Sequence, residues 1–288
     1  MSFLIYGLIG LMPGDPIDLM ISADPNLSAA DAIRLKALYG LDRPLYERYA
    51  AWLGNALTGD FGYSRLYARP VLEVIGPRLA NTLLLMGTSL VLALLIAIPA
   101  GVVAAMYPRG IVDGTINLLA FAGFSVPSVW LGLILIIVVA VQLGWLPAGG
   151  TGTPGHYLLP ALALALPFVA AIARLTRGSV AETLQEPHIT TAIAKGLPRR
   201  RIVRRHVLPI ALLPVLSYLG PAAAALLTGS VVVEQIFELP GIGRYFVQAA
   251  LNRDYTLVMG VVIVYAAFIL LFNLLVDVCY ARLDPRIR

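Results

Sequence analysis

The chain has 288 residues, of which 59% are hydrophobic and only 13% are charged, and its mean hydropathy is +0.84. This is too little charge to cover the surface of a soluble globule, so the composition predicts a protein whose solvent is the lipid bilayer. The formal net charge of +5 invites a nucleic-acid interpretation, which we reject because membrane topology accounts for the basic residues and no aromatic stacking platform surrounds them.

The chain begins with a short apolar segment, Met1 to Met12, which stops at a Pro-Gly-Asp-Pro turn. A helix needs about 20 apolar residues to cross a bilayer, so residues 1–12 predict only part of a first transmembrane helix. We therefore expect the true N-terminus to lie upstream. A cleaved signal peptide is the alternative, but the segment lacks a basic start and a small-x-small cleavage site.

Residues 13–78 form a long mixed segment with seven basic and eight acidic residues, which we expect on the extracytoplasmic side. Two short surface helices are predicted in it, at Ser28 to Ala37 and at Leu45 to Leu57. The second carries tyrosine and tryptophan, whose amphipathic rings suit a membrane interface. A lid that shields the bundle and a docking surface both fit this segment.

Four runs then lack charged residues: Leu79 to Met106, Gly114 to Ala173, Val207 to Val233, and Tyr255 to Val276. The second run is too long for one helix, and its centre, rich in glycine and proline from Gly144 to Gly155, predicts an extramembrane turn that divides it. With the short first segment, the predicted fold is all-α: a polytopic transmembrane helix bundle of six spans, with its core at residues 79–288. Prolines inside the spans predict bent helices.

The basic residues predict the orientation, because lysine and arginine in short loops stay on the cytoplasmic side. Residues 107–113 carry one, residues 174–206 carry eight and the tail from residue 281 carries three, whereas residues 144–157 carry none and residues 234–256 carry two. The first set of segments thus carries twelve basic residues and the second set carries two. This difference predicts that the first set, and with it both termini, lies in the cytoplasm.

Several classes of site are disfavoured by the residues present. The two lysines, Lys36 and Lys195, both lack the context of a phosphate-binding P-loop, so ATP hydrolysis would need a different chain. His156 falls in an outer loop and the other two histidines in an inner one, which does not predict a metal site. The single Cys279 excludes an intramolecular disulfide, and no pattern typical of a catalytic triad or carboxylate pair is present.

The inner segment from Arg174 to His206 is polar and basic and predicts a helical hairpin. The fourth span can continue through residues 180–184, Pro187 can open a short helix that Gly196 ends, and Pro198 can open a second, basic helix that leads into the fifth span. A glycine at the joint permits a left-handed backbone and leaves room for a partner surface. Taken alone, this pattern fits either a docking element or a solvated loop whose charge only sets topology.

This hairpin resembles the EAA motif of ABC importer permeases, in the form typical of the peptide, oligopeptide and nickel branch. The residues that fall on the pattern of that branch are Thr191, Ala192, Ala194, Lys195, Gly196, Leu197, Arg205, His206, Leu208 and Pro214. Thr190 and Thr191 replace the Glu and first Ala of the general motif, His206 replaces its Ile, and Leu208-Pro209 keeps its end. Ile193 stands where the branch usually has a basic residue, which puts one polar contact to the ATPase in doubt.

The likeness covers nearly the whole chain. Other similar stretches, each weak alone but strong together and in order, lie at residues 13–16, 40–44, 59–64, 125–132, 229–234, 240–243, 253–255, 273–280 and 283–286. Members of this family carry a fuller first span. The resemblance implies a type I ABC importer permease subunit of the bacterial inner membrane, which is half of a pore and not an enzyme.

The resemblance also implies the partners: a second related permease, two cytoplasmic subunits that bind ATP and Mg, an extracytoplasmic solute-binding protein, and no nucleic acid. No cofactor is implied in this chain. The ATPase-coupling residues would be Glu186, Thr190, Thr191, Ala192, Ala194, Lys195, Gly196, Leu197, Arg205, His206, Leu208 and Pro209. Ser128, Trp130, Thr228 and Glu234 are candidates for lining the solute pathway.

The transported solute stays open among dipeptides, longer peptides, glutathione-like compounds and nickel chelates. A secondary transporter or channel working alone is the alternative function, and it would be expected to show inverted repeats or membrane-buried charges, which we do not find. An intramembrane enzyme would need reactive side chains gathered at one depth, and the sequence offers none.

Overall fold

A computed structural model describes residues 3, 6, 7 and 43–283 of the chain. Most of the expected first span, the expected helix at residues 28–37 and the last five residues lie outside this part. The chain divides into two compact units. One combines Met1–Leu79 with Tyr245–Ala266, and the other combines Ala80–Arg244 with Ala267–Arg288.

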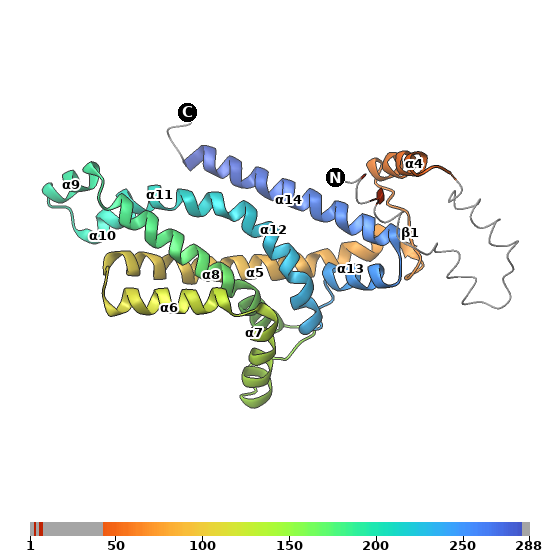
Figure 1. Ribbon diagram of the computed structural model, residues 1–288, viewed down its shortest axis with the longest axis horizontal. Coiled ribbons are helices and arrows are strands. Elements are labelled where there is room, and N and C mark those ends of the chain that lie inside the picture. Colours follow the sequence, from red (N-terminus) through yellow and green to blue (C-terminus); the bar gives the residue numbers. More distant parts are fainter. Residues whose placement is uncertain (1–2, 4–5, 8–42, 284–288) are drawn as a thin grey trace, which may run out of the picture. The chain divides into compact units, whose positions relative to one another are not determined.

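Helices account for most of the described chain, as predicted, and one two-stranded ribbon is the exception (Figure 1). The elements in chain order are α4 (Leu45–Leu57), β1 (Tyr63–Ser64), β2 (Arg69–Pro70), α5 (Val71–Met106), α6 (Ile111–Ser125), α7 (Ser128–Leu135), the π-helix η1 (Ile136–Gln142), α8 (Gly155–Thr183), α9 (Pro187–Ala194), α10 (Arg199–Ile202), the π-helix η2 (Val203–Val207), α11 (Leu208–Ala211), α12 (Leu213–Ile236), α13 (Ile242–Leu251) and α14 (Tyr255–Leu283).

The first unit is organised around a buried aspartate. β1 and β2 pair antiparallel, with Ser64 opposite Arg69. The carboxylate of Asp254, which is 2% exposed, accepts hydrogen bonds from Ser64 Oγ at 2.5 Å and from the Leu66 amide at 2.9 Å. The aspartate therefore fixes the ribbon to the turn between α13 and α14. α4 has the bounds predicted for the second surface helix.

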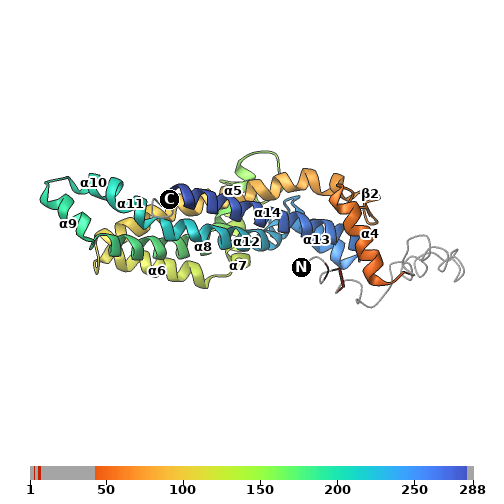
Figure 2. The same ribbon diagram turned by 90° about the horizontal axis from the view of Figure 1, so that it is seen from above.

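The second unit is built around α8, which packs against α6, α7, α11 and α12 (Figure 2). Glycines allow two of its close approaches. A Cβ at Gly101 of α5 would lie 2.6 Å from the Ala173 carbonyl oxygen, and one at Gly123 of α6 would lie 3.2 Å from Leu166. α8 is thus the helix that both α5 and α6 approach closely at glycine positions.

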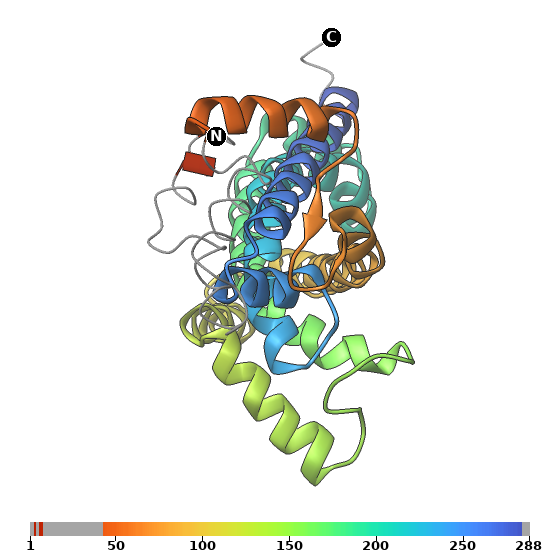
Figure 3. The ribbon, with the colours of Figure 1, turned by 90° about the vertical axis from the view of Figure 1, so that its right-hand side faces the viewer.

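In the part of the chain that the structure describes, four helices are long and apolar enough to cross a membrane: α5, α8, α12 and α14. The predicted span that starts at Gly114 is not one straight helix. α6 and the segment formed by α7 and η1 meet at an angle of 101°, so that the chain turns away from the axis of α6 (Figure 3). The break falls at Pro127, which lacks an amide hydrogen and keeps Val126 extended with φ −84° and ψ 121°.

The predicted fifth span also differs at its start. Instead of one helix from Val207, the chain forms the π-helical turn η2, the short helix α11 and then α12. Pro209 and Pro214 stand in the first turns of α11 and α12, where a missing amide hydrogen is tolerated. Pro160 and Pro167 lie inside α8 and Pro221 lies inside α12, as the prediction of proline-containing spans required.

Candidate functional site

The predicted helix, turn and second helix of the inner hairpin are all present. α8 continues to Thr183, α9 begins at Pro187, and Pro198 precedes α10. Pro187 stands in the first turn of α9, where its missing amide hydrogen costs no intrahelical bond. The carbonyl of Glu186, the residue before it, accepts a hydrogen bond from the Ile189 amide at 3.0 Å.

Gly196 ends α9 in the way its sequence position predicts. Its φ is +75°, a left-handed conformation that glycine adopts without the steric cost a side chain would add. The Gly196 amide donates to the Ile193 carbonyl at 2.8 Å, and the Leu197 amide donates to the Ala192 carbonyl at 3.3 Å. These two bonds form a Schellman motif, which pairs the last carbonyls of the helix and reverses the chain sharply.

One side of α9 is anchored in an apolar cluster. Ile189 is fully buried and Ala192 is 5% exposed. Both belong to a cluster with Ala105 of α5, Val180 of α8 and residues of the following arm; its other buried members are Ile202, Val207 and Ala211, with Leu197 and Leu208 packed against it. α9 is therefore braced against α5, the end of α8 and the arm that follows it.

The other side of α9, with the joint that follows it, is exposed and contains five of the twelve predicted coupling residues. Thr190, Thr191, Ala194, Lys195 and Gly196 are all exposed, and Ile193 is 62% exposed. The Thr191 hydroxyl donates to the Pro187 carbonyl at 3.1 Å and so stays close to the helix. The surface presents methyl groups, one ammonium group and a glycine, a combination that permits close contact with a partner.

The second arm of the hairpin carries its basic residues outward. Arg199 Nη2 donates to the Met106 carbonyl at the end of α5 at 3.0 Å. Arg205 is exposed and His206 is half-buried, while Leu208 is half-buried against the apolar cluster and Pro209 is exposed. Of the twelve predicted coupling residues, seven are thus exposed, Glu186 and His206 are half-buried, and Ala192, Leu197 and Leu208 form an anchoring set in the apolar cluster.

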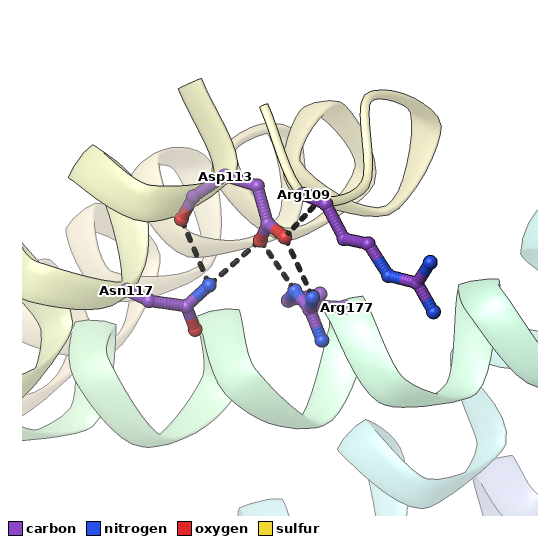
Figure 4. Close-up of polar contacts among 4 residues, drawn as sticks. All are labelled: Arg109, Asp113, Asn117 and Arg177. Atoms are coloured by element: carbon purple, nitrogen blue, oxygen red, sulfur yellow. Dashed lines mark hydrogen bonds and ion pairs between the residues drawn. The ribbon is translucent and has the colours of Figure 1, made fainter. Parts of the chain in front are cut away.

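An ion pair between a buried aspartate and a half-buried arginine lies at the base of the hairpin (Figure 4). Asp113, in the first turn of α6, is 4% exposed. The Arg177 guanidinium donates to its carboxylate twice, from Nε at 2.6 Å and from Nη2 at 2.7 Å. The Arg109 amide donates at 3.0 Å, and Asn117 Nδ2 donates to Asp113 Oδ1 at 2.6 Å.

This pair is not among the predictions made from the sequence. Arg177 counts there only as one of the basic residues that predict the orientation of the spans. The two residues are 64 positions apart, so helical spacing cannot connect them. The only sequence signal is that Asp113 is the one acidic residue of the inner turn at residues 107–113.

The four candidate pathway residues have different surroundings. Trp130 is 57% exposed, Thr228 is exposed, and Ser128 is half-buried. Glu234, by contrast, is fully buried. The structure thus separates Glu234 from the exposed candidates by its environment, and lining of the pathway by the four residues stays a prediction.

The Glu234 carboxylate is the centre of a buried hydrogen-bond network. Thr82 Oγ1 of α5 donates to Oε1 at 2.6 Å, and the Gly243 amide donates to Oε2 at 2.8 Å. Thr82 Oγ1 in turn accepts from the Ile242 amide at 2.9 Å. A Cβ at Gly241 would collide with the carboxylate, so this glycine is required by the close approach of the loop. The network ties α12 to α5 and to the start of α13.

A groove of about 710 Å³ runs along the half of α8 nearest the hairpin. Its walls combine apolar residues with two oppositely charged ones; six of the lining residues are Phe124, Arg174, Ser179, Glu182, Pro214 and Tyr218. Among the described residues, no group of three or more histidine, cysteine, aspartate or glutamate side chains could hold a metal ion.

Residues 97–288 match the family described as the binding-protein-dependent transport system inner membrane component. Among curated proteins, the chain is 42% identical to an oligopeptide transport system permease protein of Bacillus subtilis (strain 168), over 99% of this chain and 93% of that protein. It is 37% identical to a glutathione transport system permease protein of Escherichia coli (strain K12), over all of this chain and 93% of that one.

Two solved structures share the fold. A methionine ABC transporter crystallised in an inward-facing conformation matches with a TM-score of 0.59 and 19% identity, over 74% of this chain and 97% of that chain. An amino acid ABC transporter matches with a TM-score of 0.53 and 19% identity, over 74% of this chain and 93% of that chain. At this level of identity the likeness concerns the fold alone, and it confirms the predicted architecture of an importer permease.

Proposed function

Since the chain belongs to the family of binding-protein-dependent transport inner-membrane components, we propose that it is one half of the pore of an ABC importer for peptides or related small solutes. The family is one of multi-pass inner-membrane permeases that work with ATPase and substrate-binding partners. The proposed assembly contains a second, related permease, two cytoplasmic subunits that bind ATP and Mg, and an extracytoplasmic solute-binding protein.

The observation that carries this proposal is the two-sided construction of α9. Its inner side is anchored by Ile189 and Ala192, whereas its outer side is exposed. A helix that serves only as a solvated loop has no need of this anchor. A helix that receives force from a partner needs both a free face and a rigid support, and α9 has both.

The proposed mechanism is alternating access. Closure of the ATPases around ATP pushes on the exposed side of α9, and the braced hairpin transmits the movement to α8 and α12, because α8 packs against α12. The broken helices at Pro127 and near Pro209 offer places where the chain can bend. Chemistry on the solute is not part of this cycle.

The proposed orientation places the hairpin and both termini in the cytoplasm. It rests on the excess of basic residues in the segments that include the hairpin, twelve against two in the opposite loops. The Gly144–Gly155 turn, which carries no basic residue, would then face the solute-binding protein.

For the solute, the likeness to an oligopeptide permease and to a glutathione permease favours a peptide or a peptide-like compound such as glutathione. Nickel chelates and dipeptides stay as alternatives within the same branch. The solute-binding protein would make the main selection, so measuring which ligand it binds distinguishes these classes.

The docking role is tested by Gly196→Trp in the complete importer. A large side chain on the exposed joint, at a φ of +75°, would block close approach of the ATPase, so the variant is expected to insert normally but to lose co-purification of the ATPase or ATP-driven uptake. Gly144→Trp is the matched control for co-purification of the ATPase, because Gly144 lies in the turn proposed to face away from the ATPase, also has a positive φ of +64°, is exposed and has open space where a Cβ would lie. ATP-driven uptake that persists with Gly196→Trp would refute the docking role, and uptake without nucleotide would favour a stand-alone transporter.

A further inference from the structure

The turn between α5 and α6 is held by the hairpin from both sides. Arg177 lies before α9 in the chain and binds Asp113, where α6 begins. Arg199 lies after α9 and binds the carbonyl of Met106, where α5 ends. The two arginines therefore connect the two arms of the hairpin to the two ends of a single turn.

The contact at Asp113 is directional. Both carboxylate oxygens are engaged by the planar guanidinium of Arg177, and two further donors, the Arg109 amide and Asn117 Nδ2, complete the set. A bidentate pair fixes the angle between the two groups as well as their distance. The carboxylate is 4% exposed and has four donors around it, so it cannot rotate away from Arg177 without leaving other donors unpaired.

The turn itself is a stiff object. Arg109 has a φ of +61°, which is unusual for a residue with a side chain and persists only where surrounding contacts impose it. The carboxylate that accepts from the Arg109 amide is the one that Arg177 binds, so one ion pair both shapes the turn and joins it to α8.

We propose that Asp113 and Arg177 are a positioning pair, through which the α5–α6 turn and α6 move together with the hairpin when the ATPases act on α9. This proposal rests on the proposed function, because it takes α9 as the point where force enters. Without the pair, the hairpin would still move α8, but α6 would follow only through apolar packing, which permits sliding.

Arg177→Lys and Asp113→Asn are the diagnostic variants. Lysine keeps the positive charge but presents a single ammonium group in place of the fork, and asparagine keeps the shape of aspartate without its charge. Arg282→Lys is the matched control, because Arg282 is an exposed arginine near the end of α14 and lies outside the pair.

Movement is measured by the distance between spin labels in the complete importer, before and after nucleotide is trapped with ATP and vanadate. Cys279, the only natural cysteine, is replaced by serine, and labels are placed at Gln185 in the hairpin and at Leu118 on α6, both of which are exposed. In a second labelled protein, the spin labels are placed at Gln185 and at Leu270 of α14, and the distance between them shows whether the hairpin moves at all.

In the parent protein, trapping should change the Gln185–Leu270 distance while the Gln185–Leu118 distance stays within about 1 Å, because the pair holds α6 to the hairpin. In Arg177→Lys and Asp113→Asn, the Gln185–Leu118 distance should shift by about 2 Å, the scale of a helix displacement, with ATPase still bound. The control Arg282→Lys should behave like the parent protein.

Three results would overturn the inference: an unchanged Gln185–Leu118 distance in both variants, a shift as large in the parent protein as in the variants, or loss of folded protein in both variants, which would assign the pair to stability alone. A parent protein that binds no ATPase, or whose Gln185–Leu270 distance does not respond to trapping, would refute the proposed function instead.

Discussion

Asp113 and Glu234 are two buried carboxylates of the second unit that are held in opposite ways. Asp113 is bound by a guanidinium whose side chain is still 34% exposed, whereas Glu234 is bound by a buried threonine hydroxyl and by backbone amides. The first arrangement joins α6 to α8 through a charged side chain that is still partly accessible from outside. The second closes a loop onto two helices and leaves no partner free to move. Asp113 thus connects two elements that we propose to move together, whereas Glu234 holds a loop at a fixed point of the unit.

The largest expected effect tests the fixed point. Glu234→Ala removes the acceptor for Thr82 Oγ1 and the Gly243 amide and opens a cavity, so the free energy of unfolding should fall by about 4 kcal/mol. Denaturation of the purified protein in detergent micelles measures this. The exposed Glu238 provides the control, since Glu238→Ala should change stability by less than about 0.5 kcal/mol. Equal stabilities of the two variants would contradict the structural role of the Glu234 network.

The anchor under the hairpin should give the next largest effect. Ile189→Ala empties a fully buried site and should cost about 3 kcal/mol, which would appear as faster amide hydrogen exchange in residues 184–208. Ile193→Ala removes the same number of atoms from a residue that is 62% exposed, so it should leave exchange unchanged and weaken ATPase binding. Equal rates of amide hydrogen exchange in the two variants would contradict the division of α9 into an anchored side and an exposed side.

Gly196→Ala should have a smaller effect, about 1 kcal/mol, because a methyl group at a φ of +75° is strained even though the space around it is open. Gly144→Ala adds similar strain in another exposed loop and should destabilise the protein by a similar amount. The difference is expected in function, since only the first variant should reduce ATPase activity of the assembled importer. A loss of activity in both would point to strain as the cause.

The smallest effect is expected for Lys195→Gln. Lys195 is exposed, and an exposed charge contributes at most about 1 kcal/mol, so folding stability should not change measurably. If its ammonium group contacts the ATPase, the affinity of the parent protein for the ATPase should fall with rising salt more steeply than that of the variant. Identical salt dependence of binding would remove Lys195 from the docking surface.

The architecture could be predicted because its determinants are local. Long apolar runs specify the spans, and proline and glycine at residues 187, 196 and 198 specify the hairpin without reference to any distant residue. The bounds of α4 and the end of α9 at Gly196 follow the same rule.

The features that sequence reasoning misses depend on contacts between distant segments. Glu234 is among the predicted pathway candidates and directly follows the run that predicts the fifth span. Its burial is explained by Thr82, 152 positions away, together with the Gly243 amide. The right-angle break at Pro127 falls within a span predicted to be continuous, since a proline tells where a helix can bend but the neighbouring helices decide by how much.

The break at Pro127 has a consequence for the lipid around this chain. α6 has 15 residues, which corresponds to about 22 Å at 1.5 Å per residue, whereas the hydrocarbon layer is about 30 Å thick. Because the chain turns by 101° after Ser125, α6 does not gain the missing length from α7. Phe121 and Phe124, both well exposed, therefore face a region where the bilayer must become thinner or where a neighbouring protein must replace it. An isolated subunit should accordingly prefer lipids with shorter acyl chains, and assembly should remove that preference.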